Sequence, residues 1–172
     1  LGPLPEGQMH ARCAGQPPYE LARQPGAYNL ERILAAADLT RDGAEAVPKM
    51  LGLLDDKDDA VRFWAVTGLC ASRDRSPEVL AALTRALKDA CPTVRVAAAD
   101  ALRRTGDHKD ALPVLTEALG DENKWVRLRA VIVLDEMGEK ARPALAAIRT
   151  HRDDPNQYVC RVVRHVMKTF EE

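Results

Sequence analysis

Apolar side chains recur along this chain with a nearly constant period. The valines Val61, Val94, Val126 and Val159 lie 33, 32 and 33 residues apart. In each period, further apolar residues follow the valine four and eight positions later, which places all of them on one face of an α-helix. A fixed period in this range is typical of a stacked array of structural repeats. The pattern therefore predicts a helix that begins beside each valine.

A second apolar pattern precedes each of these helices. It covers residues 46–54, 79–87, 111–119 and 144–151. Its expected core columns are Val47/Leu80/Leu112/Leu145 and Met50/Leu83/Leu115/Ile148. A short acidic turn joins the two helices of each period, and the alternation typical of strands does not occur. We therefore expect an all-α fold, an α-α superhelix of four helix pairs.

The residues at the expected helix ends agree with this pattern. Asp58, Asn123 or Asn156 stands three residues before the column valine, and each can cap the second helix of its pair. The second period has Cys91 at this position, followed by Pro92, which suits the first helical residue. These residues predict where the second helices begin.

The repeats are expected to fill residues 44–172, at about 44–73, 76–106, 108–138 and 141–172. Residues 1–43 lack the repeat. They are expected to form a Pro-rich arm and then a helix at about 29–40 that caps the first repeat, as terminal elements of solenoids do. The apolar face of this helix is expected to contain Leu30, Ile33, Leu34 and Ala37. Because the first residue is Leu1 and not Met, we expect a piece of a longer polypeptide.

Composition narrows the function without identifying it. The chain has 25 basic and 26 acidic residues among 172, and this near-neutral balance counts against nucleic acid as a partner. No apolar run approaches the ~20 residues that span a bilayer. The four cysteines are widely spread and form no CxxC pair, which argues against a metal site or a disulfide framework. No catalytic motif occurs, so we predict no catalytic residue, cofactor or small-molecule ligand.

An aspartate recurs in the turn of every period, and Val-Arg follows it in the first three. The aspartates are Asp56, Asp89, Asp121 and Asp154. The tetratricopeptide and ankyrin patterns are absent, and the combination of acidic turn and Val-Arg resembles HEAT repeats, of the short type noted in phycobilisome lyases. This resemblance covers residues 44–172. It implies an α-solenoid that binds another protein.

The arginine of each Val-Arg pair lies in the first turn of a helix, where the macrodipole disfavours a cation. These arginines are Arg62, Arg95 and Arg127, and Asp56, Asp89 and Asp121 lie in the turns beside them. Pairing of each arginine with the aspartate of its own or a neighbouring turn would form a ladder that holds the repeats in register. The functional alternative is an anion-binding stripe. The fourth repeat has Cys160 in place of the arginine.

The second helices carry more apolar residues than a solvated face requires. The positions two, six and nine residues after the column valine lie opposite the expected core. Phe63, Val96, Leu128 and Ile132 occupy several of them and are expected to form an apolar ridge beside a basic end with Arg161 and His165. Such a surface on a solenoid is typical of partner binding. The alternatives are a helical phase wrong by one position, or scattered apolar exposure without a role.

Residues 4–38 are similar to a junction found in some bacterial sulfatases, between the catalytic domain and C-terminal HEAT repeats. The similar segments are Leu4-Pro5-Glu6, Met9-His10, residues 18–23, and residues 30–34 running into 36–38. The resemblance implies a non-catalytic accessory module that docks on a sulfatase-like catalytic domain or on another protein. The nucleophile and calcium ligands of that family are not among these residues.

Two other functions are kept as alternatives. A bilin-lyase-like protein would bind a tetrapyrrole or form an adduct at a cysteine. A nucleic-acid-binding HEAT protein would show strongly salt-dependent affinity. The sequence indicates neither the compartment nor the oligomeric state.

Overall fold

The computed structural model describes residues 30–106 and 109–171, and these residues form helices joined by short turns, with no strand among them. The elements in chain order are α3 (Leu30–Asp38), η1 (Leu39–Arg41), η2 (Gly43–Ala46), α4 (Val47–Leu53), α5 (Asp59–Ser72), α6 (Pro77–Ala86), α7 (Pro92–Thr105), α8 (Ala111–Ala118), α9 (Lys124–Met137), η3 (Gly138–Ala144), α10 (Leu145–Thr150) and α11 (Gln157–Glu171). The arm expected at residues 1–27 lies outside the described residues.

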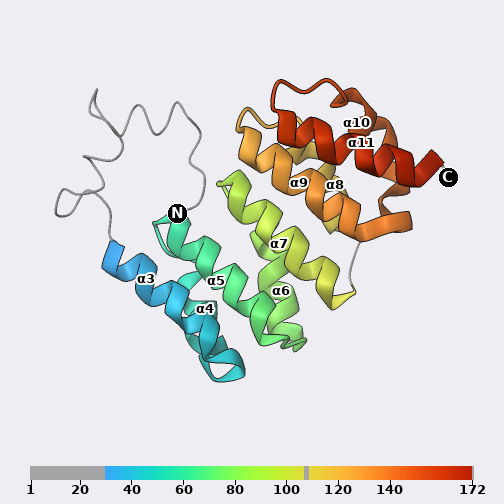
Figure 1. The fold of residues 1–172 in the computed structure, drawn as a ribbon. Coiled ribbons are helices and arrows are strands. Elements are labelled where there is room, and N and C mark those ends of the chain that lie inside the picture. The colour runs from blue at the N-terminus through green and yellow to red at the C-terminus, as the bar shows by residue number, and fades with distance from the viewer. Residues whose placement is uncertain (1–29, 107–108, 172) are drawn as a thin grey trace, which may run out of the picture.

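The helices stack in two layers (Figure 1). Helices α5, α7, α9 and α11 lie side by side in one layer, and the shorter helices α4, α6, α8 and α10 lie behind them. Each helix of the first layer contacts its neighbours in that layer and the short helix that precedes it in the chain. We call α5, α7, α9 and α11 the second-helix layer. The arrangement confirms the predicted all-α superhelix of helix pairs.

Side-chain caps begin three of the four second helices. Asp58 accepts a hydrogen bond from the Ala60 N–H at 2.9 Å, and Asn123 accepts one from the Trp125 N–H at 3.0 Å. Asn156 accepts from the backbone of α11 in the same way. These contacts satisfy N–H groups that a helix start leaves without partners. Helix α7 has no such cap and begins at a proline instead, as its sequence predicts.

The core consists largely of the predicted columns. The second-helix residues are buried at all three column positions, except for the half-buried Met167 at the end of the last column. The column of Met50 is also buried. In the other predicted first-helix column Val47 is buried, but the position that is buried in all four pairs lies one residue earlier. The buried positions are Ala46, Val79, Ala111 and Ala144, whereas Leu80, Leu112 and Leu145 are half-buried. The buried position and the half-buried position lie four and three residues before the Met50 column, so both are on the side of the helix that faces the core. Alanines and Val79 occupy the fully buried position, and the leucines lie at the edge of the core.

Helix α3 caps the stack with a face that agrees with the prediction at Ile33 but differs from it at Leu30 and Leu34. Ile33 and Ala36 are buried in a small cluster with Val61 of α5. Leu30 and Leu34, which were expected on the same face, are 49% and 53% exposed. The helix therefore carries apolar residues both toward α5 and toward solvent. None of the helices in the described ranges is long and apolar enough to cross a membrane.

Candidate functional site

Arginine–aspartate contacts run along the turns between first and second helices. Arg62 donates to both carboxylate oxygens of Asp89, in the next turn, at 2.7 and 2.8 Å. Arg127 makes the same paired contact with Asp154 at 2.8 and 2.9 Å. The remaining Nη1 of each arginine donates to a backbone carbonyl of its own turn. Each of these arginines thus ties its own helix pair to the following pair.

The two aspartates are held in their charged form. Burial alone would raise the pKa of Asp89, but the hydrogen bonds from Arg62 and from the Cys91 N–H outweigh it, and the pKa lies below its ordinary value. The pKa of Asp154 is lowered in the same way, with burial opposed by Arg127 and the Asn156 N–H. Both carboxylates therefore stabilise the folded chain more when charged than when protonated.

Helix α3 supplies the first contact of this line. Arg32 donates through Nη2 to Asp56 Oδ2. Asp56 is buried and also accepts a hydrogen bond from the Asp58 N–H at 2.9 Å. Helix α3 thus contacts the turn of the first pair as α5 contacts the turn of the second pair and α9 that of the fourth.

The line is interrupted between the second and third helix pairs. Arg95 donates to the backbone carbonyls of Asp89 and Ala90 at 3.0 and 3.3 Å, and its ion pair is with Glu117 at 3.9 Å. The carboxylate of Asp121 accepts a hydrogen bond from the backbone N–H of its own turn instead, at 2.8 Å. No contact between Arg95 and Asp121 is present, so this joint lacks the paired contact that the others have.

A cluster of charges lies at the same joint, in the second-helix layer. The buried carboxylate of Asp100, in α7, accepts hydrogen bonds from Arg103 at 2.7 and 3.0 Å, Arg104 at 3.3 Å and Arg129 of α9 at 2.6 Å. Arg103 also donates to Glu136 of α9. We call these five residues the Asp100 cluster. It links α7 to α9 through three ion pairs, of Arg103 and Arg104 with Glu136 and of Arg129 with Asp100.

The Asp100 cluster combines a buried anion with exposed cations. The Asp100 side chain is 8% exposed, whereas those of Arg104 and Arg129 are 52% and 47% exposed. Burying a carboxylate is costly unless cations and donors surround it. Asp100 and Arg103 stand six and nine residues after Val94, at positions that the sequence pattern places opposite the core, so nothing in the pattern predicted a buried carboxylate. The available signal was the spacing of Asp100, Arg103 and Arg104, since residues three and four apart on a helix are neighbours.

The family model for HEAT repeats matches residues 47–119 and 80–167. Together these matches cover every helix pair described above. The chain belongs to the HEAT-repeat family.

Solved structures show the same kind of fold. The chain is similar to a structure of the complex of CpcE and CpcF of phycocyanin lyase from Nostoc sp. PCC7120, with 22% identity, a TM-score of 0.58 and coverage of 94% of this chain and 96% of that one. A designed armadillo repeat protein in complex with the peptide (KR)4 matches with 18% identity, a TM-score of 0.45 and coverage of 95% and 98%. At these identities the likeness concerns the fold alone. No curated protein matches the sequence.

The prediction that Val96 belongs to an exposed apolar ridge is wrong, because Val96 is only 1% exposed. Arg103 lies seven residues further along α7, on nearly the same side, and it reaches Glu136 of α9. That side therefore faces the next second helix and not solvent. The prediction considered each helix against its own pair and overlooked the neighbour in the second-helix layer.

The other ridge residues differ in exposure. Phe63 and Leu128 occupy the same repeat position as Val96 and are half-buried, packed against the core. Ile132 is half-buried four residues after Leu128. Arg161, at this position in the last repeat, is exposed, and so is His165, whose Nε2 lies 3.9 Å from Asp135 Oδ2. Of these residues, Ile132, Arg161 and His165 remain available for a partner.

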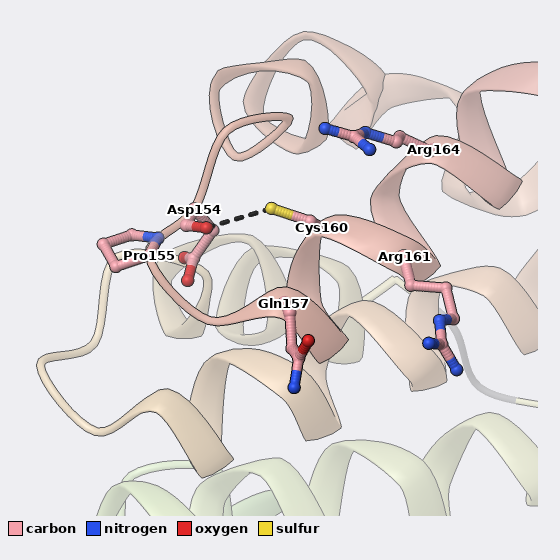
Figure 2. Close-up of a pocket in the computed structure, with 6 residues that line it drawn as sticks. All are labelled: Asp154, Pro155, Gln157, Cys160, Arg161 and Arg164. Carbon is pink, nitrogen blue, oxygen red and sulfur yellow. Dashed lines mark hydrogen bonds between the residues drawn. The ribbon is translucent and has the colours of Figure 1, made fainter.

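An open pocket of about 450 Å³ lies at the start of α11 (Figure 2). Cys160 occupies the place of the column arginine, and its thiol donates to the Asp154 carbonyl at 2.9 Å. Arg161 and Arg164 also line the pocket, and their side chains extend in different directions. In residues 30–106 and 109–171, no group of three or more His, Cys, Asp or Glu side chains is placed to hold a metal ion.

Proposed function

We propose that this HEAT array is a non-catalytic interaction module, the accessory region of a sulfatase-like hydrolase, and that it docks on the catalytic domain through helix α3. The observation that carries this proposal is the exposure of Leu30 and Leu34, at 49% and 53%, on a helix that already buries Ile33 and Ala36 against α5. An amphipathic capping helix needs apolar residues on one side only.

The position of these leucines supports the proposal. They lie in α3, which forms the last part of the segment that is similar to the sulfatase junction. A domain attached upstream would lie at this end of the stack. Leucines four residues apart form one strip along a helix, and covering that strip would remove apolar surface from water. The HEAT repeats would then hold the attached domain at a fixed distance from a second partner.

Photo-crosslinking tests this docking in the full-length protein expressed from its own gene. A benzoylphenylalanine at position 34 is expected to crosslink to a sulfatase-like domain, and one at Ala81, an exposed position of α6, is not. The Leu30→Asp variant should abolish the crosslink from position 34 while the circular dichroism spectrum stays unchanged. Crosslinks of equal yield from positions 34 and 81, or none from 34, would contradict the proposal.

The likeness to a phycocyanin lyase complex makes a bilin-lyase-like protein the second candidate. An adduct would require a reactive thiolate, because the thiolate is the nucleophilic form of cysteine. Burial raises the pKa of both Cys70 and Cys91 and disfavours that form. We therefore expect no covalent adduct and no shifted absorbance band after incubation with a bilin. A stable adduct on Cys70, Cys91 or Cys160, seen by mass spectrometry, would favour the lyase instead.

A further inference from the structure

We propose that the Asp100 cluster is a second binding surface, which takes a carboxylate-rich segment of a partner protein. The cluster lies at the joint of α7 and α9, away from α3, so this proposal does not depend on the docking site proposed above. It names the chemistry of the second partner that a HEAT module of this kind would hold.

The cluster has a surplus of cationic donors. Arg103, Arg104 and Arg129 share two carboxylates, those of Asp100 and Glu136. Arg104 donates to Asp100 through Nε and places Nη2 3.9 Å from Glu136 Oε2, and Arg129 donates to Asp100 through Nη2. A guanidinium has several further N–H groups. These remaining donors belong to side chains that are about half exposed and can therefore meet an incoming carboxylate.

Asp100 also fixes the arginines in position before a ligand arrives. Long exposed side chains lose rotamer entropy when they bind, and this loss weakens most surface ion pairs. The buried Asp100 carboxylate already restrains Arg104 and Arg129, each by a hydrogen bond. The planar fork of an arginine matches a carboxylate with paired N–H···O bonds. A restrained pair of arginines is thus suited to acidic side chains.

The surroundings favour an acidic protein segment over nucleic acid. Glu136 belongs to the cluster, and Asp135 lies beside it on α9. A continuous phosphate backbone would meet these carboxylates as well as the arginines, and the chain as a whole has a net charge of −1. Ile132 of the same helix offers apolar contact.

Fluorescence anisotropy tests this assignment with the whole chain and a labelled peptide of alternating Glu and Ser. We expect binding that weakens as salt is added, and a loss of about tenfold in affinity in the Arg104→Ala/Arg129→Ala variant. The matched control is Arg85→Ala/Arg152→Ala, which removes the same charge from exposed positions outside the cluster and should change affinity less than about twofold. A peptide of alternating Lys and Ser should not bind.

Three results would overturn the proposal. The first is an equal loss in the cluster variant and the matched control, which would indicate attraction by net charge alone. The second is tighter binding of a short DNA duplex than of the acidic peptide. The third is tighter binding of the acidic peptide by Asp100→Asn. This variant makes the cluster more positive and removes the carboxylate that restrains Arg104 and Arg129. Tighter binding would therefore show that the restraint does not contribute to affinity. Circular dichroism and thermal melting of every variant separate loss of binding from loss of fold.

Discussion

The joint between α5 and α7 and the joint between α7 and α9 are held by different electrostatic contacts. At the first, Arg62 and Asp89 form a paired contact with side chains that are 14% and 11% exposed. At the second, Arg95 makes no contact with Asp121, and Arg129 reaches across from α9 with a side chain that is 47% exposed. The Arg62–Asp89 contact lies between the turns, and the Arg129–Asp100 contact lies on the second-helix layer.

This difference separates structural arginines from arginines that can bind. An arginine whose donors are taken up by a buried carboxylate and by backbone carbonyls has little left for a ligand. Arg62 and Arg127 are in this state, which supports the predicted role of the ladder in holding the repeats in register. Arg104 and Arg129 keep exposed donors. Repeat position in the sequence therefore does not indicate which arginines keep exposed donors, whereas their burial in the fold does.

The largest expected effect concerns the apolar layer that both joints share. Leu102 of α7 is 1% exposed, and Leu102→Ala should lower the free energy of unfolding by roughly 2–5 kcal/mol through lost burial and a cavity. Urea denaturation followed by circular dichroism measures this change. Leu34→Ala, at an exposed position, is the control and should cost less than about 0.5 kcal/mol. Similar costs for both variants would show that the helical register described here is wrong.

A matched pair of aspartates then distinguishes the two joints. Asp89 and Asp121 hold equivalent repeat positions and both accept a backbone N–H of their own turn, but only Asp89 pairs with an arginine. Asp89→Asn should cost about 2 kcal/mol because it leaves Arg62 without its charged partner, and Asp121→Asn should cost less than about 0.5 kcal/mol. Equal costs in urea denaturation would remove the distinction between the joints.

The smallest expected effect is a dependence on pH. The pKa of Asp89 and that of Asp154 are lower in the folded chain, so their stabilisation is complete above the unfolded value of about 3.9 and is lost as the pH falls through the folded values. The free energy of unfolding should therefore fall as the pH drops below about 4. Asp89→Asn should show a shallower fall. A curve unchanged by this substitution would indicate that other carboxylates control acid unfolding.

Periodic residues could be placed from the sequence because each helix pair repeats the same packing. The columns of Val61 and Met50 and the caps at Asp58 and Asn123 were all predicted correctly. Residues that depend on contacts between different repeats could not be placed in this way. Val96 is buried although it lies opposite the core of its own pair, and the inner face of α3 keeps Ile33 but has Ala36 in place of Leu30 and Leu34.

The Asp100 cluster could not be predicted from the repeat pattern, because its residues do not recur at the equivalent positions of the other repeats. The equivalent positions of Asp100 carry Thr67, Ile132 and His165, so no column singles out an aspartate. Its role depends on Arg129, 29 residues away, which approaches only after α7 and α9 pack together. Local spacing could indicate Arg103 and Arg104 as neighbours of Asp100, but the contact between helices and the burial of the carboxylate appear only in the fold.

The most direct test of the account compares Arg62→Met with Arg129→Met, since each variant removes one guanidinium. Affinity for the Glu/Ser peptide is measured for both, with the free energy of unfolding determined on the same samples. We expect Arg62→Met to lose about 2–3 kcal/mol of stability with affinity changed less than about twofold, and Arg129→Met to lose about threefold or more in affinity with stability changed by less than about 1 kcal/mol. If both variants lost affinity equally, the separation of structural from binding arginines would be wrong.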